Sequence, residues 1–245
     1  MGGARLTTSI YPIDKTREII YNNNGDWMKE IDKKEIDFDK YYQELDNIPK
    51  HHLLDEIKEY AKINKVPIIL DDGLKVLLHF IEGNKAIRIL EIGTAIGYSA
   101  INMALVNPNS IIDTIERNID MYNEAVKNVN LFGLNSRINV ILADAIDIDI
   151  NDLNDHYDFI FIDAAKAQYI KFFNKYEVLL NKNGIIFSDN LKFHGLVDNN
   201  KEGLSKNLRN LVKKIEDYNL FLKNNPNYYT EFIDIGDGIG ISYKK

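Results

Sequence analysis

Residues 88–100 read R-I-L-E-I-G-T-A-I-G-Y-S-A, an apolar stretch that runs through two glycines into a helix-forming segment. Gly93 and Gly97 let the backbone turn tightly and approach a ligand, because no Cβ atom stands in the way. Ser99 lies where the helix begins, so its hydroxyl and the free backbone N–H groups can meet a polar ligand. The spacing G-x-x-x-G differs from the G-x-G-x-x-G of dinucleotide enzymes and favours a nucleoside without a pyrophosphate. A lone glycine loop is more often a plain turn, so this interpretation needs support from other segments.

The segments after this loop alternate between strand and helix patterns. The strand candidates are short, apolar and β-branched, as strands buried on both faces should be: Ile87–Ile92, Ile111–Ile115, Ile138–Leu142, Phe159–Ile162 and Gly184–Ser188. The helical segments are Ser99–Val106, Met121–Phe132, Lys166–Leu180 and Leu204–Leu222. This alternation predicts a Rossmann-like, doubly wound α/β fold with a mostly parallel sheet. Asp237-Gly238, between two alternating apolar runs, predicts an antiparallel C-terminal hairpin.

The first fifty residues differ from the rest. Residues 21–27 are rich in turn-forming residues, and residues 28–40 are charged with little periodicity. We therefore expect residues 1–50 to be an arm that is partly disordered or loosely docked, and residues 51–245 to be the folded domain. Two helices are predicted to open that domain, one from His51 to the break before Pro67 and one from about Gly73 to Ile81.

The composition is that of an ordinary globular protein, with 245 residues, 45% hydrophobic and 27% charged. The absence of cysteine excludes disulfides, zinc-thiolate sites and cysteine nucleophiles. No apolar run approaches the roughly 20 residues that span a bilayer. The N-terminus lacks the apolar segment of a signal peptide. We therefore expect a cytoplasmic protein.

The net charge of -7 argues against a general nucleic-acid binder. However, residues 165–215 contain ten Lys or Arg and four Asp or Glu, a local excess of six positive charges, which leaves -13 on the remainder. Two interpretations stay open. The basic stretch is either a solvated helix surface or a basic rim for an anionic substrate.

Two further strand ends carry candidate ligand-binding residues. Glu116 ends the second strand candidate, where a carboxylate can accept hydrogen bonds from both ribose hydroxyls. Asp144 and Ala145 end the third, a position that suits an adenine edge or ring face. Because ligands of open α/β sheets bind at the carboxyl ends of the strands, these positions reinforce the glycine loop.

The last two predicted parallel strands also end in polar side chains. Asp163 follows F-I-F-I, and Asp189 and Asn190 follow G-I-I-F-S. Two carboxylates and an amide oxygen form a ligand set that suits Mg²⁺, with Ca²⁺ and Mn²⁺ as near equivalents. The alternative is that these residues cap helices or turns. Lys166 is either a solvated helix residue or a base beside the metal.

Four motifs together resemble the cation-dependent O-methyltransferases, the family of catechol and caffeoyl-CoA O-methyltransferases. They are L-E-I-G-T-A-I-G-Y-S at 90–99, F-I-D-A-A-K at 161–166, S-D-N at 188–190 and I-G-D-G-I-G-I-S at 235–242. V-P-I-I-L-D-D-G-L at 66–74 and E-I-G-T-A-I-G-Y-S-A at 91–100 are similar to bacterial enzymes of this family that methylate 5-hydroxyuridine at the tRNA wobble position. Residues before His51 match no family motif.

The resemblance implies that the methyl donor is S-adenosylmethionine and that the enzyme is a homodimer. It places the cofactor beside Ile69, Glu91, Gly93, Gly97, Tyr98, Ser99, Glu116, Asp144, Ala145 and Asp163. It assigns Asp163, Asp189 and Asn190 as ligands of Mg²⁺, or of Mn²⁺ or Ca²⁺, and Asp163 and Lys166 as the catalytic pair, with Lys166 as the base. His194, close to the metal motif, is read as a surface histidine.

A metal site of this kind needs an acceptor hydroxyl with a neighbouring oxygen. 5-Hydroxyuridine in tRNA, which would become 5-methoxyuridine, has such a pair, and so does a catechol. The basic stretch favours tRNA, and a small-molecule catechol or phenol O-methyltransferase is the alternative. Two other classes stay open: a non-catalytic cofactor- or RNA-binding module and, disfavoured by the glycine spacing, a nicotinamide oxidoreductase.

Overall fold

The computed structural model describes the backbone of residues 9–12, 17–21 and 27–32, and then residues 42, 44–154, 156–193, 195–197 and 203–245. His194 lies outside the described residues. No described helix has the length and apolar character needed to cross a membrane.

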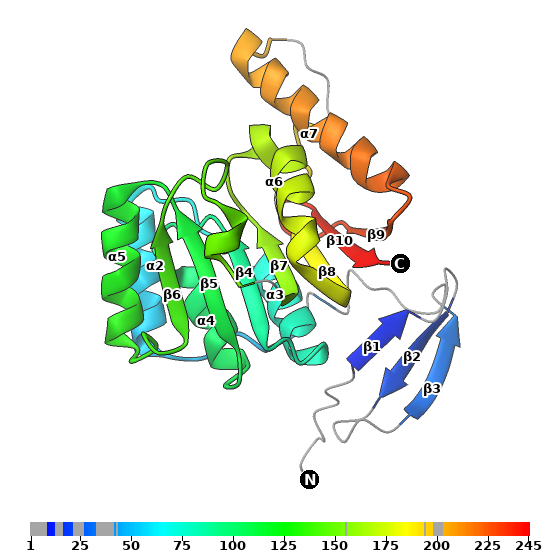
Figure 1. The fold of residues 1–245 in the computed structure, drawn as a ribbon, viewed down its shortest axis with the longest axis horizontal. Helices are drawn as coiled ribbons and strands as arrows, with labels where there is room; N and C mark the ends of the chain where they lie inside the picture. The colour runs from blue at the N-terminus through cyan, green and yellow to red at the C-terminus, as the bar shows by residue number, and fades with distance from the viewer. Residues whose placement is uncertain are drawn as a thin grey trace.

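A seven-stranded sheet forms the centre of the molecule (Figure 1). In sheet order its strands are β6 (Ile138–Leu142), β5 (Ile111–Glu116), β4 (Arg88–Ile92), β7 (Tyr157–Ile162), β8 (Leu180–Ser188), β10 (Ile239–Lys244) and β9 (Tyr228–Ile233). The first five are parallel, and β10 is antiparallel to both of its neighbours. The predicted fold class is confirmed, and so is the C-terminal hairpin, although residues 234–238 make its loop longer than a two-residue turn.

The chain runs outward from β4 through β5 to β6 and then returns to place β7 on the other side of β4. This reversal creates a topological switch point between β4 and β7. Open α/β sheets bind ligands at the carboxyl ends of the strands at such a point. The topology therefore directs attention to the segments that follow Ile92 and Ile162.

Helices cover both faces of the sheet. They are α2 (His52–Asn64), α3 (Asp71–Gly83), α4 (Tyr98–Val106), α5 (Ile119–Leu131), α6 (Tyr169–Tyr176) and α7 (Lys206–Asn224), with 3-10 turns η2 (Ile150–Asp152), η3 (Lys166–Gln168) and η4 (Glu177–Leu179). Successive residues of β4 supply opposite faces: Ile89 packs with the core under α3 and α4, whereas Leu90 packs with the core under α6. Both are fully buried, as predicted for strands covered on two sides.

The prediction of one continuous helix over Lys166–Leu180 is wrong. Only Tyr169–Tyr176 is α-helical, and η3 and η4 flank it. Gln168 interrupts the helix with φ -116° and ψ 3°. The buried stripe of α6 starts at Tyr169 and ends at Tyr176, so burial supports a helix of two turns rather than four.

The N-terminal segment contains three short antiparallel strands, β1 (Ser9–Pro12), β2 (Arg17–Tyr21) and β3 (Trp27–Asp32). Farther along the predicted arm, Tyr42 is buried and its ring lies 5.6 Å from the ring of His79 on α3. Asn47 donates a hydrogen bond to the backbone carbonyl of Lys75, also on α3, at 2.9 Å. The end of the arm therefore packs on α3, where burial lowers the pKa of His79 to about 4. Loose docking of residues 1–50 as a whole stays a prediction.

Candidate active site

The loop between β4 and α4 passes so close to the end of β7 that position 93 requires glycine. Gly93 has a φ of 105°, and a Cβ atom there would lie 2.1 Å from the backbone carbonyl oxygen of Asp163. Gly97, directly before α4, has a φ of 84°. Both values lie in the left-handed region, which glycine adopts at least cost. The glycine loop and the first acidic motif are thus adjacent.

Glu91 lies inside β4 and is fully buried. It accepts hydrogen bonds from the hydroxyl groups of Ser99 and Thr114, and Thr114 Oγ1 lies 2.6 Å from Thr94 Oγ1. Burial raises the pKa of Glu91 to about 8. Glu91 therefore ties the start of α4 to β5.

Glu116 ends β5 and receives backbone hydrogen bonds on both carboxylate oxygens. The N–H of Ala95 donates to Oε2 at 2.9 Å, and the N–H of Asn118 donates to Oε1 at 2.8 Å. A carboxylate offers about four acceptor positions, so about two remain for a ligand. This arrangement suits the two hydroxyls of a ribose.

A cavity of about 340 Å³ lies at the carboxyl ends of β4, β5 and β7, within the range of small-molecule sites. Of the positions predicted to bind the cofactor, it is lined by Ile69, Gly93, Tyr98, Ser99, Glu116, Ala145 and Asp163. Glu91, Gly97 and Asp144 lie outside the lining. The structure thus brings most of the predicted cofactor residues to one cavity.

Asp144 holds the turn that carries Ala145. Its Oδ1 accepts a hydrogen bond from the N–H of Ile146 at 2.8 Å, and its Oδ2 lies 3.6 Å from a guanidinium nitrogen of Arg117. Ala145 lines the cavity, and its carbonyl accepts a hydrogen bond from Tyr176 at 2.6 Å. Asp144 thus caps the turn in this structure, and Ala145 forms part of the cavity wall.

The three predicted metal ligands follow the hydrogen-bonded neighbours β7 and β8. Asp163 and Asn190 line the cavity, whereas Asp189 is 2% exposed and accepts a hydrogen bond from the N–H of Asn190 at 2.7 Å. Asn190 has a φ of 62°, a backbone conformation tolerated by asparagine more readily than by most residues. The turn after β8 therefore places a carboxylate and an amide in succession beside Asp163.

Lys166 opens η3 at the same edge of the sheet. Its ammonium group donates a hydrogen bond to Oδ1 of Asn190 and lies 5.7 Å from the ring centroid of Phe193. Lys166 also lines the cavity. It is therefore a partly buried cation within the site rather than a solvated helix residue.

The carboxyl groups of this site have raised pKa values. Burial raises the pKa of Asp163, an effect that Lys166 opposes and Asp237 reinforces. Burial also raises the pKa of Asp189 to about 8, with a contribution from the charge of Asp163. Clustered buried carboxylates are stabilised in their ionised form by an additional cation.

Within the described residues, no group of three or more His, Cys, Asp or Glu side chains is arranged to hold a metal ion. The predicted set has only two such side chains, because Asn190 supplies an amide. Carboxylate and amide oxygens are nevertheless the ligands that Mg²⁺, Ca²⁺ and Mn²⁺ prefer. The chemical types of the three donor groups therefore fit a hard divalent cation.

A second cavity, of about 570 Å³, adjoins the first. The two share the wall formed by residues 66–68, and both are lined by Lys166 and Asn190. The second cavity extends to α2 and to Asp237 in the β9–β10 loop. The sequence predicts a helix break at residues 66–68 and a hairpin turn at Asp237, and both lie in motifs of the resemblance, but it assigns neither of them to the acceptor side of the site. Two cavities that meet at Lys166 and Asn190 can place two molecules in contact.

Comparison with known proteins agrees with this arrangement. Residues 32–245 match the family described as O-methyltransferase. A putative caffeoyl-CoA O-methyltransferase of Arabidopsis thaliana is 29% identical over 212 residues, which cover 82% of this chain and 90% of the relative. A caffeoyl-CoA O-methyltransferase of Populus kitakamiensis is 28% identical over 214 residues, with the same coverage.

Solved structures share the fold. That of a putative caffeoyl-CoA O-methyltransferase from Staphylococcus aureus has a TM-score of 0.75 and 37% identity, and the match covers 87% of this chain and 98% of that one. An O-methyltransferase from Bacillus cereus, solved in complex with SAH, has a TM-score of 0.71 and 25% identity, covering 85% and 97%. These relatives favour an enzyme over a non-catalytic binding module. The chain therefore belongs to the O-methyltransferase family and is an S-adenosylmethionine-dependent O-methyltransferase.

Proposed function

We propose that this enzyme is cation-dependent and methylates a hydroxyl group that has a neighbouring oxygen, with Asp163, Asp189 and Asn190 as the cation ligands. The observation that supports this most directly is the meeting of the two cavities at Lys166 and Asn190. The first cavity would hold S-adenosylmethionine, with its ribose at Glu116. The second would hold the acceptor.

The residues divide the chemistry between them. Asp163, Asp189 and Asn190 would hold a divalent cation, which when bound would lower the pKa of an acceptor hydroxyl. Nζ of Lys166, in its neutral form, or solvent would take the hydroxyl proton. The deprotonated acceptor oxygen would then form a bond to the methyl carbon of S-adenosylmethionine as the carbon–sulfur bond breaks, with S-adenosylhomocysteine as the leaving group. The sulfonium charge disappears in this step, so the main contribution of the chain is to position the two molecules.

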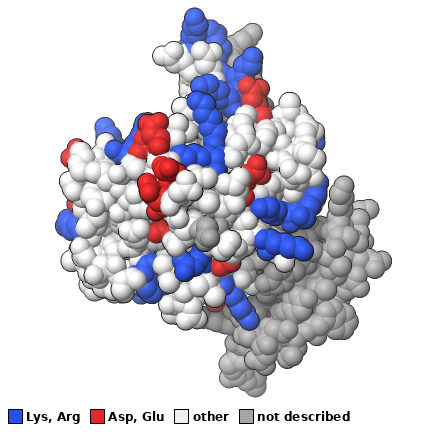
Figure 2. Space-filling model, viewed as in Figure 1, with Lys and Arg blue, Asp and Glu red and all other residues white. Residues whose placement is uncertain are grey.

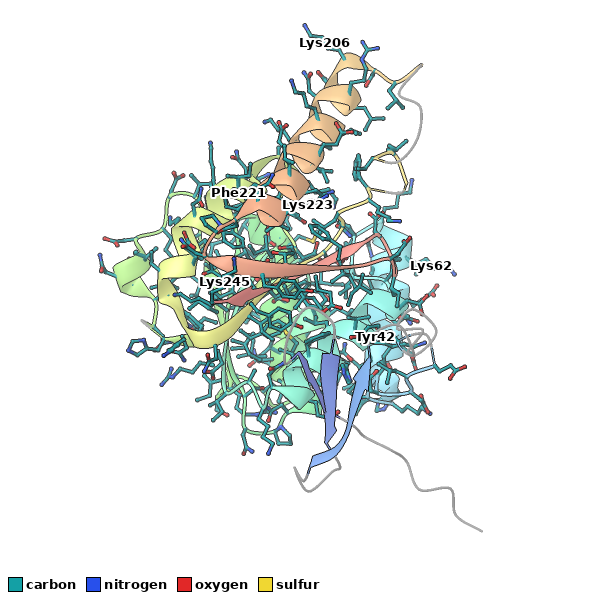
Figure 3. All side chains as sticks on the ribbon, turned by 90° about the vertical axis from the view of Figure 1, so that its right-hand side faces the viewer. Tyr42, Lys62, Lys206, Phe221, Lys223 and Lys245 are labelled. Atoms are coloured by element: carbon teal, nitrogen blue, oxygen red, sulfur yellow. The ribbon has the colours of Figure 1, made fainter. Side chains whose placement is uncertain are left out.

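We propose 5-hydroxyuridine of tRNA as the acceptor, with 5-methoxyuridine as the product. Lys206, Arg209 and Lys213, called here the α7 basic stripe, are exposed and form no ion pair with another described residue. Figure 2 shows Lys and Arg side chains along α7, and Figure 3 shows Lys206 at its outer end, away from Phe221 and the sheet. α7 also contacts η3, the turn that carries Lys166. This exposed positive charge supports an RNA acceptor, whose phosphates it would meet while the base enters the site.

A small catechol or phenol is the second candidate acceptor. The size of the second cavity suits a small molecule, and the relatives named caffeoyl-CoA O-methyltransferases point in the same direction. Both acceptors present two adjacent oxygens, so the cation site alone does not separate them.

Methyl transfer from labelled cofactor separates the two acceptors. The substrates are bulk tRNA from a strain that lacks the enzyme and, in parallel, a catechol. We expect the label to enter the tRNA. After digestion of the tRNA to nucleosides, the label should be found in 5-methoxyuridine. Labelled catechol with unlabelled tRNA would replace the tRNA acceptor by the small molecule.

The α7 basic stripe makes a separate prediction. Changing Arg209 and Lys213 together to alanine should weaken tRNA binding and lower the slope of log affinity against log salt by about 1 per removed phosphate contact. Filter binding over a salt series measures this slope. The control changes Lys85, which precedes β4, and Lys182, near the start of β8. Both lysines are exposed and lie by the amino ends of these strands, away from the cavities, so the slope should be unaltered. Equal losses in both variants would contradict a specific role for α7.

A further inference from the structure

Asp237 is a buried carboxylate that the proposed chemistry leaves without a role. It lies in the loop between β9 and β10 and is 4% exposed. Its neighbours along the lining of the second cavity include Lys166 and Asn190. Buried carboxylates are stabilised by nearby charges and hydrogen bonds, and Asp237 lines the same cavity as one of the proposed cation ligands.

The loop of Asp237 is fastened to the segment that follows Asn190. The N–H of Lys192 donates to the carbonyl of Asp237 at 2.8 Å, and the N–H of Leu191 donates to the carbonyl of Gly238 at 2.9 Å. Gly238 has a φ of 80°, and a Cβ atom there would lie 3.0 Å from the backbone nitrogen of Lys192. The glycine therefore permits a backbone contact that fixes Asp237 relative to Asn190.

The same loop also approaches Asp189, through α3. A Cβ atom on Gly236 would lie 3.4 Å from the nitrogen of Gly73, and a Cβ atom on Gly73 would lie 3.9 Å from Oδ1 of Asp189.

We propose that Asp237 is a positioning residue of the cation site, which supplies a third carboxylate charge around the ion and holds the segment carrying Asn190. This inference rests on the proposed cation dependence. Before the acceptor binds, Lys166 in its ammonium form together with one divalent cation would balance the charge of the three carboxylates. Asp237 would act on the cation through a bridging water or through its electrostatic attraction, rather than as a direct ligand. The reason is that the described residues contain no arrangement of three acidic or histidine ligands. Its removal should therefore weaken cation binding without affecting the cofactor cavity, whose lining it does not join.

The test compares Asp237→Asn with Asp234→Asn. Asparagine keeps the shape of the side chain and removes its charge. Asp234 lies in the same loop, but it is exposed and pairs with Lys192 at 2.6 Å, so the control removes an equal charge away from the site. Electron paramagnetic resonance of Mn²⁺ titrated into the full-length protein gives the cation dissociation constant, and calorimetry gives that of S-adenosylmethionine.

We expect Asp237→Asn to weaken Mn²⁺ binding roughly 10- to 100-fold, the usual effect of losing an outer-shell partner. S-Adenosylmethionine affinity should stay within about twofold, and Asp234→Asn should match the wild type for both. Unchanged Mn²⁺ affinity in Asp237→Asn would overturn the inference and leave the cation dependence standing. Loss of both Mn²⁺ and cofactor binding would show a general structural role and overturn it as well. A wild-type protein that binds no Mn²⁺ would overturn both this inference and the proposed cation dependence.

Discussion

Replacing Asp163 by alanine is expected to lower kcat/KM by about 10³-fold in saturating Mg²⁺. A cation that polarises an acceptor oxygen supplies several kcal/mol of transition-state stabilisation, and each 1.4 kcal/mol corresponds to a factor of ten. Asp163 is the residue at which the proposed cofactor and cation positions meet, because it lines the cofactor cavity and its carbonyl lies against Gly93. Initial rates over a Mg²⁺ series measure the loss and show whether extra cation restores part of it.

The matched control for this variant is Asp147→Ala. Asp147 also follows a parallel strand, but it is exposed and lies outside both cavities. Its removal should change kcat/KM by less than about twofold, because exposed substitutions away from a site are usually near neutral. An Asp163→Ala enzyme that retains Mg²⁺-stimulated transfer within a few-fold of the wild type would remove Asp163 from the cation site.

The central sheet was predictable because each strand is a short apolar, β-branched run bounded by turn residues. Ile138–Leu142 is predicted to the residue, and Tyr157–Ile162 differs from its prediction only by two residues at the start. The continuity of the helix after Lys166 was not predictable in the same way. Its apolar periodicity extends through residues that the tertiary structure uses as 3-10 turns beside the site.

The site was predictable where a simple rule of topology applies. Parallel strands that are neighbours in the sheet end at one edge, so residues after β5, β7 and β8 converge there whatever the details of packing. The rule places Glu116, Asp163, Asp189 and Asn190 at the same edge of the sheet, as the structure has them. The rule does not apply to the antiparallel hairpin beyond β8, so it gives Asp237 no place at the site.

Contacts between segments that are distant along the chain could not be predicted from the sequence. The wall formed by residues 66–68 depends on how α2 and α3 pack over the sheet. The partners of Glu91 depend on the pairing of β4 with β5, which brings Thr114 beside it, and on the start of α4, which brings Ser99. The resemblance assigns Glu91 to the cofactor site. In the structure Glu91 lies outside the lining of the first cavity and accepts a hydrogen bond from Ser99, which lines it.

This buried position gives Glu91 a predictable effect on stability. Its pKa is raised by burial from an ordinary value of 4.5 to about 8. Between these two values the folded chain keeps the proton of Glu91 and the unfolded chain releases it. The free energy of unfolding therefore falls as pH rises through this window, by at most about 1.4 kcal/mol per pH unit from this one group.

Changing Glu91 to glutamine should remove this dependence, because the amide is neutral at every pH and imitates the protonated carboxyl. Its oxygen can accept the hydrogen bond of Ser99 while its N–H donates to Thr114, whose hydroxyl then donates to Thr94. Urea unfolding of cofactor-free protein at pH 5, 6, 7 and 8 measures the effect as the difference between variant and wild type, in which the contributions of distant groups cancel. We expect the variant to gain stability relative to the wild type by a few kcal/mol, in order of magnitude, from pH 5 to pH 8. A difference that stays constant over this range would mean that Glu91 is ionised in the folded protein. The chain of hydroxyls from Thr94 to Ser99 would then be stabilising a buried anion rather than sharing the proton of a neutral acid.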